Sequence, residues 1–297
     1  MGKFGQVLTA MVTPFDSNMA VAYDKAAELA AYLVDHGNDG LVVAGSTGEA
    51  ATLTDEERLK LFETVLAAVG DRAYVIGGTG TNDTAKSVRL TKEAARIGLH
   101  GAMLVAPYYN KPSQEGLYRH FAAAAEAAPG LPIIVYNVPG RTGINLLPET
   151  VQRLAKMENI VAVKEASGNL EQMSEIIRTT PDDFDLYSGD DALTLPALAI
   201  GGCGIISVAG HIVGREIKAM ITAFLAGELA RARELHLKLL PVYRAMFIAT
   251  NPTPVKAAVN MLGLAAGDVR LPLVAPGAAD LEKIRAEMLK IGLPVKA

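Results

Sequence analysis

The sequence predicts an α/β fold, a (β/α)8 TIM barrel with a C-terminal helical extension. Short apolar runs alternate with amphipathic stretches of helical length, the pattern of repeated βα units. Eight such runs lie within residues 1–225, which is the number of strands that a barrel of this type needs. No GxGxxG follows the first run, so nothing marks the dinucleotide crevice of a doubly wound sheet.

The eight predicted strands are short, rich in β-branched residues and bounded by turn residues. They cover residues 7–13, 40–45, 73–78, 101–106, 132–137, 160–165, 184–188 and 204–208. Helices are predicted between them, for example over residues 24–37, 55–70 and 84–98, where apolar residues recur at spacings of three and four. Several of these stretches begin after a Thr or Ser and stop at a Gly, the residues expected at helix ends.

The chain changes character after residue 225, where strands cease and only helical patterns remain. Residues 227–247 and 279–292 are the longest of these patterns. We therefore expect a catalytic barrel over residues 1–225 and an appended helical domain over residues 226–297.

Composition and charge exclude several classes of function. The 297 residues carry a formal net charge of −4 and no basic run interleaved with aromatics, so no nucleic-acid partner is expected. No stretch approaches the roughly 20 apolar residues of a membrane span, and the N-terminus lacks a signal-peptide pattern, so we expect a cytoplasmic protein with no membrane partner. Cys203 is the only cysteine, and the five histidines show no ligand spacing, so neither a disulfide nor a metal site is expected.

Lys164 closes an apolar run that has the character of a buried strand. Residues 161–169 read VAVKEASGN, and a barrel carries its active-site groups at the C-terminal ends of such strands. Strict alternation places Ile160 and Ala162 on the face of Lys164, and Val161 on the opposite face. Two interpretations are open at this point. A desolvated lysine is partly neutral and can form a Schiff base with a ketone; alternatively, its head reaches solvent past the strand end.

The preceding strand also ends in candidate groups. Residues 132–143 read PIIVYNVPGRTG, and Tyr136 falls at the C-terminal end of that strand as Lys164 does in the next. A phenol beside an amine can shuttle the protons that carbinolamine formation and dehydration require, although buried tyrosines are more often structural. Arg141 in the following loop offers a planar fork that suits a substrate carboxylate.

Two further loops carry small, polar or aromatic side chains. Residues 45–53 read GSTGEAATL, a Gly-rich turn whose backbone N–H groups can hold a carboxylate or phosphate. The GK[ST] sequence of a Walker loop is absent from it. Tyr108 and Tyr109 start the loop after the fourth strand, and adjacent exposed aromatics more often serve an interface than chemistry.

Five motifs taken together resemble the dihydrodipicolinate synthase family, whose wider superfamily includes N-acetylneuraminate lyase. They are GSTGE (45–49), PYYNKPSQEGL (107–117), YNVPGRTG (136–143), VKEASGN (163–169) and SGDD (188–191). The resemblance runs along essentially the whole chain and includes the C-terminal helices. It implies an aldolase-type lyase in which Lys164 forms a Schiff base with pyruvate and no cofactor takes part.

The resemblance also implies a proton relay. Tyr136 would be the proton shuttle, and the hydroxyl of Ser46 and the phenol of Tyr109 would complete the relay, with Tyr109 contributed across a dimer interface. It further implies a homotetramer built as a dimer of dimers. A silent barrel that only binds a small oxo acid is the alternative from another class. The joint presence of Lys164, Tyr136, Tyr109 and Ser46 argues against it, because a binder needs no nucleophile and relay.

The same resemblance implies the substrates. Thr47 and the backbone of Ile206 would hold the pyruvate carboxylate, and Arg141 would receive the carboxylate of L-aspartate 4-semialdehyde. The product would be 4-hydroxy-tetrahydrodipicolinate, on the diaminopimelate route to lysine. A pyruvate-dependent sugar-acid aldolase or lyase is the alternative. At the position of Ser46 many synthases have Thr, whereas a Ser also appears there in the sugar-acid lyases. Arg141 favours the synthase, because N-acetylneuraminate lyases typically lack an arginine there.

The pocket that binds lysine in feedback-inhibited family members is altered in this sequence. Asn82 and Tyr108 match its Asn and Tyr, but Lys86 replaces its carboxylate, and Asp55 and Arg58 replace its histidines. A cation at residue 86 would repel the ammonium of free lysine. We therefore predict insensitivity to lysine feedback.

Overall fold

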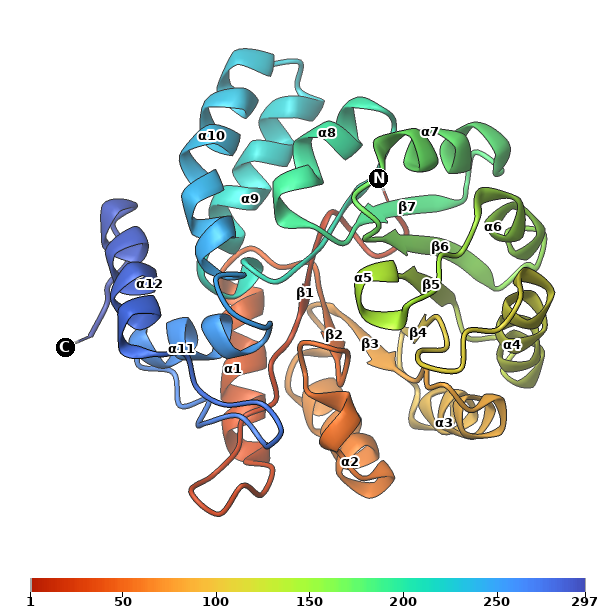
Figure 1. Cartoon of the computed structure of the whole chain (residues 1–297), viewed down its shortest axis with the longest axis horizontal. Coiled ribbons are helices and arrows are strands. Elements are labelled where there is room, and N and C mark those ends of the chain that lie inside the picture. Colours follow the sequence, from red (N-terminus) through yellow and green to blue (C-terminus); the bar gives the residue numbers. More distant parts are fainter. Residues whose placement is uncertain (1, 297) are drawn as a thin grey trace.

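The computed structural model describes residues 2–296 and shows a closed barrel of eight parallel strands (Figure 1). The strands follow the chain order around the barrel, and β1 closes it by pairing with β8. They are β1 (Val7–Ala10), β2 (Gly40–Val43), β3 (Tyr74–Gly78), β4 (Gly101–Val105), β5 (Ile133–Asn137), β6 (Ile160–Glu165), β7 (Asp185–Ser188) and β8 (Gly204–Ser207). Each lies within its predicted range, so the barrel prediction is confirmed.

Helices connect the strands and surround the barrel (Figure 1). They are α1 (Tyr23–Asp35), α2 (Asp55–Val69), α3 (Thr84–Ile97), α4 (Gln114–Ala127), α5 (Pro139–Thr142), α6 (Pro148–Leu154), α7 (Leu170–Thr179), α8 (Thr194–Ala199) and α9 (Gly210–Leu225), with short 3-10 turns η1 (Ala50–Thr52) and η2 (Asp191–Leu193). Polar side chains cap the N-termini of α2, α3, α4 and α7. Thr54 and Glu57 form a reciprocal capping box at α2, and Asp83 and Ser113 accept backbone hydrogen bonds at α3 and α4.

Apolar side chains fill the barrel interior, so the barrel is a packed core and not a pore. This inner cluster includes Leu8, Val42, Ile76, Met103 and Ile206, all at most 3% exposed. A second, larger cluster fills the layer between the strands and the surrounding helices. With both faces of the sheet covered, a polar side chain on a strand is accessible only at the strand ends.

The prediction of strictly alternating side chains along β6 is wrong at the first two residues of the strand. The pairing with β5 shifts between Ile133 and Ile134, so that Ile160 pairs with Ile133 but Ala162 pairs with Ile134. The extra residue, Val161, joins the inner cluster, and Ile160 packs in the outer layer. A β-bulge of this kind cannot be read from residue types, because it depends on the neighbouring strand. Beyond it the alternation resumes.

The chain after α9 forms three more helices, α10 (Leu229–Ala245), α11 (Thr253–Met261) and α12 (Ala278–Lys290). α10 packs along α9, and α12 packs on α10 and α11 (Figure 1). The two helices predicted in this region match α10 and α12 closely. Within residues 2–296, no helix combines the length and the hydropathy that crossing a membrane requires.

Candidate active site

A cavity of about 350 Å³ lies at the C-terminal ends of the strands. Its walls come from the segments that follow β2, β3, β4 and β5, and from residues of the C-terminal extension. Lining residues that carry polar groups are Ser46, Glu49, Thr52, Arg58, Tyr108, Tyr136, Arg141, Thr142 and Asn251. This is the end of a (β/α)8 barrel at which ligands bind.

Lys164 lies at the end of β6, is 4% exposed and is not part of the cavity lining. Its Nζ atom is 4.4 Å from the centroid of the Tyr136 ring. Among the described residues 2–296, no carboxylate forms an ion pair with it. The interpretation in which the lysine head reaches solvent past the strand is therefore wrong.

The pKa of Lys164 is lowered from its ordinary 10.5 to about 7, chiefly because burial disfavours the ammonium form. The positive charge of Arg141 lowers it further, and the carboxylate of Asp191 opposes the change. A substantial fraction of the amine is therefore neutral near pH 7. Such an amine can attack a carbonyl carbon without a separate base to remove its proton.

Tyr136, on β5, pairs in register with Lys164 on β6 and also lines the cavity. Burial raises its pKa to about 12, and the charge of Arg141 only partly opposes this effect. The phenol therefore keeps its proton at neutral pH and can donate it. Within residues 2–296 nothing hydrogen-bonds to its hydroxyl, which leaves that group available to a ligand.

The Gly-rich turn after β2 carries Ser46 and Thr47. Ser46 lines the cavity, whereas the buried Thr47 hydroxyl accepts a hydrogen bond from Asn251 Nδ2 at 3.0 Å. Two residues that are not glycine, Ala44 and Glu49, adopt left-handed backbone conformations here, with φ of 53° and 56°. The turn therefore has a bent path that its surroundings must maintain.

Arg141 lies on the single turn of α5 and lines the cavity. Its Nη2 atom donates to the carbonyl oxygen of Asn251 at 2.9 Å. Among the described residues it has no carboxylate partner, so its charge faces the cavity uncompensated. A side chain of this kind attracts an anionic group of a substrate.

Of the predicted site residues, Ser46, Tyr136 and Arg141 line the cavity, whereas Lys164, Thr47, Ile206 and Tyr109 do not. Ile206 is buried on β8, where it pairs with Leu8 and belongs to the inner cluster. Tyr109 is 88% exposed and has a φ of 75°. Only its neighbour Tyr108 lines the cavity, so within this single chain Tyr109 takes no part in the site.

Sequence reasoning missed Asp191 and Asn251. Asp191 is 1% exposed, and its carboxylate accepts bonds from Ser207 Oγ and from the backbone N–H groups of Val208 and Ala209. It is a charged group close enough to act on the pKa of Lys164. Asp191 lies in the SGDD motif, but the sequence of this motif does not indicate a role for it. Asn251 gives no local signal, because its partners are about 110 and 204 residues away.

The fold and this site define an aldolase-type lyase, an enzyme that activates an oxo substrate on a buried lysine amine. The model of the Dihydrodipicolinate synthetase family matches residues 3–290 of the chain. The chain belongs to that family.

Relatives of known name support this assignment over the full length. The 4-hydroxy-tetrahydrodipicolinate synthase of Moorella thermoacetica is 57% identical over 291 residues, which cover 98% of this chain and 99% of the relative. The crystal structure of a dihydrodipicolinate synthase from Bacillus anthracis has 50% identity and a TM-score of 0.95, covering 97% of this chain and 99% of that one. The enzyme from Cyanidioschyzon merolae, solved with lysine bound, has 48% identity and a TM-score of 0.97, covering 99% and 100%.

Proposed function

We propose that this chain is the enzyme that condenses pyruvate with L-aspartate 4-semialdehyde to give 4-hydroxy-tetrahydrodipicolinate, the reaction for which its relatives are named. One observation carries the mechanism: Lys164 is buried without an ion pair, and its pKa is about 7. That state suits a nucleophile.

The reaction follows from this amine. The neutral Nζ of Lys164 attacks the keto carbon of pyruvate, and loss of water from the carbinolamine gives the Schiff base. Removal of a methyl proton converts the Schiff base to an enamine, whose carbon attacks the aldehyde carbon of the semialdehyde. The amino group of the added substrate then attacks the imine carbon, which closes the ring and releases Lys164.

Tyr136 carries the protons of these steps. Its phenol protonates the carbinolamine hydroxyl so that it leaves as water, and it recovers a proton afterwards. The hydroxyl of Ser46, which lines the same cavity, passes protons onward. The relay extends to Tyr109 of a second copy of the chain, and the 88% exposure of this phenol leaves it free to reach a neighbour. The proposal therefore includes a dimer, and a homotetramer assembled as a dimer of dimers in the cytoplasm.

Two carboxylates are bound at different places in this proposal. The pyruvate carboxylate meets the Gly-rich turn at Thr47 and the backbone of Ile206. The carboxylate of the semialdehyde meets Arg141, whose charge is uncompensated at the cavity wall.

Replacing Arg141 by Ala is therefore expected to raise the KM for the semialdehyde about 100-fold, because a charge-assisted pair is lost. The KM for pyruvate should rise less, although loss of this charge also removes one of the influences that lower the pKa of Lys164. Arg141→Lys, which keeps the charge but not the planar fork, is the matched variant. Its KM for the semialdehyde should lie between those of the parent and of Arg141→Ala. Steady-state kinetics with each substrate varied in turn measures both constants. A larger effect on pyruvate than on the semialdehyde would reverse the assignment of the two carboxylate sites.

The substrate test compares pyruvate consumption by purified protein with L-aspartate 4-semialdehyde and with N-acetylmannosamine. We expect turnover with the semialdehyde alone, and pyruvate trapped on Lys164 by borohydride. Trapping without turnover of the semialdehyde would keep the Schiff-base chemistry and replace the substrate by a sugar-derived aldehyde. Absence of trapping would refute the mechanism.

Two of the residues that replace the family's lysine pocket, Lys86 and Asp55, form an ion pair with each other. Lys86 Nζ lies 3.0 Å from Asp55 Oδ1, and Arg89 Nη2 lies 2.7 Å from Asp55 Oδ2. Arg58 is 3% exposed and donates to two backbone carbonyls, and burial lowers its pKa. A bound lysine molecule would therefore face three cations, Lys86, Arg89 and Arg58. The nearby carboxylate, that of Asp55, is already paired.

Free lysine at sub-millimolar concentration is therefore expected to leave turnover unchanged. The measurement is the initial rate with and without lysine, beside calorimetric binding of lysine. The Cyanidioschyzon merolae enzyme, solved with lysine bound, serves as the positive control for binding. Inhibition in the sub-millimolar range would show that these replacements do not remove the effector site.

A further inference from the structure

The last residue of the GSTGE motif, Glu49, has no part in the chemistry described above, yet its side chain is buried. It is 5% exposed as a residue and its side chain only 1%. A buried carboxylate requires partners, and these come from the C-terminal extension. Glu49 Oε1 pairs with Lys256 Nζ of α11 at 2.8 Å, and Glu49 Oε2 accepts from the backbone N–H of Arg270 at 2.9 Å.

Lys256 is as buried as its partner. It is 1% exposed, and its Nζ also lies 4.0 Å from the centroid of the Phe15 ring. Burial lowers its pKa, and the carboxylate of Glu49 opposes this change. The pair joins residues 207 positions apart, one in the Gly-rich turn and one in the extension.

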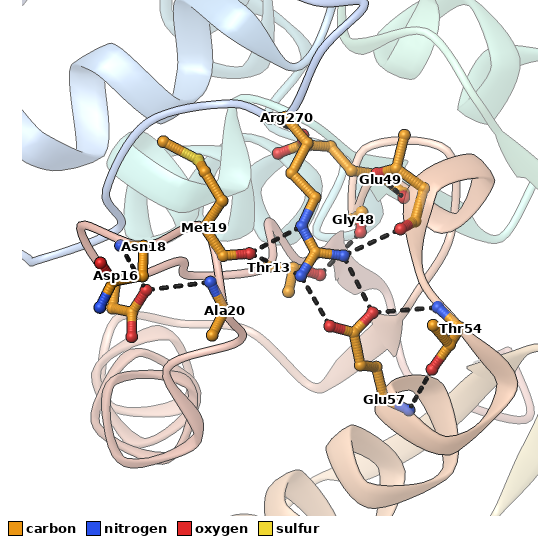
Figure 2. A network of polar contacts seen from close by, with 11 residues as sticks. Thr13, Asp16, Asn18, Met19, Ala20, Gly48, Glu49, Thr54, Glu57 and Arg270 are labelled. Carbon is orange, nitrogen blue, oxygen red and sulfur yellow. Dashed lines mark hydrogen bonds and ion pairs between the residues drawn. The ribbon is translucent and has the colours of Figure 1, made fainter.

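Arg270 adds a second connection around the same turn (Figure 2). Its guanidinium forms a bidentate pair with Glu57 at 2.9 and 2.6 Å and donates to the carbonyl oxygen of Thr52 at 2.8 Å. It also donates to the carbonyl oxygen of Met19 at 2.6 Å. The extension therefore holds the turn at Glu49 and the start of α2 together.

The turn needs such support because of its backbone. Ala44 and Glu49, which flank Ser46 and Thr47, both have positive φ. Residues with a Cβ do not hold this conformation unless the surrounding structure fixes them. Gly48 contributes a further fixed point, since its carbonyl accepts from Thr13 Oγ1 at 2.7 Å.

We infer that the buried Glu49–Lys256 pair is a positioning device, by which the C-terminal extension fixes the turn that presents Ser46 and Thr47 to pyruvate. The inference rests on the proposed function, since it assigns the turn to the pyruvate side of the site. Lys256 does not line the cavity, and both carboxylate oxygens of Glu49 are engaged, by Lys256 and by the backbone N–H of Arg270. The extension is in this respect part of the active site and not only an appended domain.

The inference predicts different kinetic effects for the two substrates. Displacement of the turn weakens binding and activation of pyruvate, whereas Arg141 belongs to α5 and bonds to the backbone carbonyl of Asn251, not to Glu49 or Lys256. Loss of the pair should therefore raise the KM for pyruvate and lower kcat, with the KM for the semialdehyde nearly unchanged. If the ion pair were purely structural, its loss would lower the melting temperature without changing the KM for pyruvate more than the KM for the semialdehyde.

The test uses Lys256→Met in the full-length protein, with Lys218→Met as the matched control. Lys218 forms an ion pair with Asp39, which immediately precedes β2 at the other end of the barrel. We expect Lys256→Met to lower kcat/KM for pyruvate about tenfold or more, because small displacements of a positioning segment have large effects on rate. Lys218→Met should lower stability only, and leave kcat/KM within about twofold of the parent.

Glu49→Gln keeps the inference testable if Lys256→Met does not fold. It preserves the shape of the side chain and keeps one oxygen that can accept from Lys256, with loss of the bond from the Arg270 N–H, so it should fold and lower kcat/KM for pyruvate in the same direction by a smaller factor. The inference is overturned if the folded variants lose stability but keep the parent's kcat/KM and pyruvate KM. Failure of the proposed function would differ, because the parent protein itself would then show no turnover.

Discussion

Replacement of Lys164 by Met will abolish turnover and stabilise the folded protein. Turnover should fall by more than about 1,000-fold, because no other group can form the covalent intermediate. The gain in stability has a separate cause. Met fills the same space without the amine, whose charged form is disfavoured by burial in the barrel.

The size and the pH dependence of this gain follow from the pKa of Lys164. It is about 7 in the folded chain and returns to its ordinary 10.5 when the chain unfolds. Each pKa unit corresponds to about 1.4 kcal/mol, so the buried ammonium costs on the order of 5 kcal/mol below pH 7. Between pH 7 and 10.5 the unfolded chain binds more protons than the folded one, so the stability of the parent rises with pH. The advantage of the Met variant is therefore fully present below about pH 7 and disappears above pH 10.5.

Chemical denaturation of the parent and of Lys164→Met at several pH values measures this difference directly. Lys164→Arg is the matched variant: it is also inactive, but its guanidinium stays charged and should destabilise the fold at every pH. In the parent, kcat/KM for pyruvate should fall as the pH drops below 7, where the amine becomes protonated. Equal stability of the Met and Arg variants at pH 6 would contradict the assigned burial of the ammonium.

The fold could be predicted because the information that specifies it is local. Eight apolar runs separated by helical patterns gave the barrel, and the position of Lys164 at the end of one run placed it at the active end. Tyr136 followed from the same argument on the adjacent strand. Alternation failed only where β6 carries a bulge at Val161, which depends on the pairing with β5.

The parts of the site that could not be predicted are those made by distant segments. Thr47 meets Asn251 across 204 residues, and Glu49 meets Lys256 across 207. Nothing in the residues around Asn251 or Lys256 distinguishes them from ordinary polar residues of a helical extension. Their roles arise only when the chain returns to the mouth of the barrel. Tyr109 is the opposite case, since its role depends on a second copy of the chain and stays a prediction.

The second large effect is expected at Tyr136. Tyr136→Phe should lower kcat about 100- to 1,000-fold, the range that general acid–base groups contribute. The variant removes one oxygen, and the ring that lies 4.4 Å from Lys164 Nζ remains, so the environment of the amine changes little. Stability should be nearly unchanged, because within residues 2–296 no group hydrogen-bonds to this hydroxyl.

Tyr187→Phe provides the control that separates the loss of a phenol from the loss of a proton shuttle. Tyr187 lies on β7 and, like Tyr136, faces the barrel interior, but its hydroxyl donates to the carbonyl of Gly5 at 3.1 Å and accepts from the N–H of Phe4 at 3.2 Å. Its removal leaves buried groups unpaired and should cost about 1–3 kcal/mol of stability without changing kcat. The two variants therefore have opposite effects. Tyr136→Phe should lose turnover and keep stability, whereas Tyr187→Phe should lose stability and keep turnover. A Tyr136→Phe enzyme with nearly the parent's kcat would remove Tyr136 from the relay, because water or Ser46 would then suffice to carry the proton.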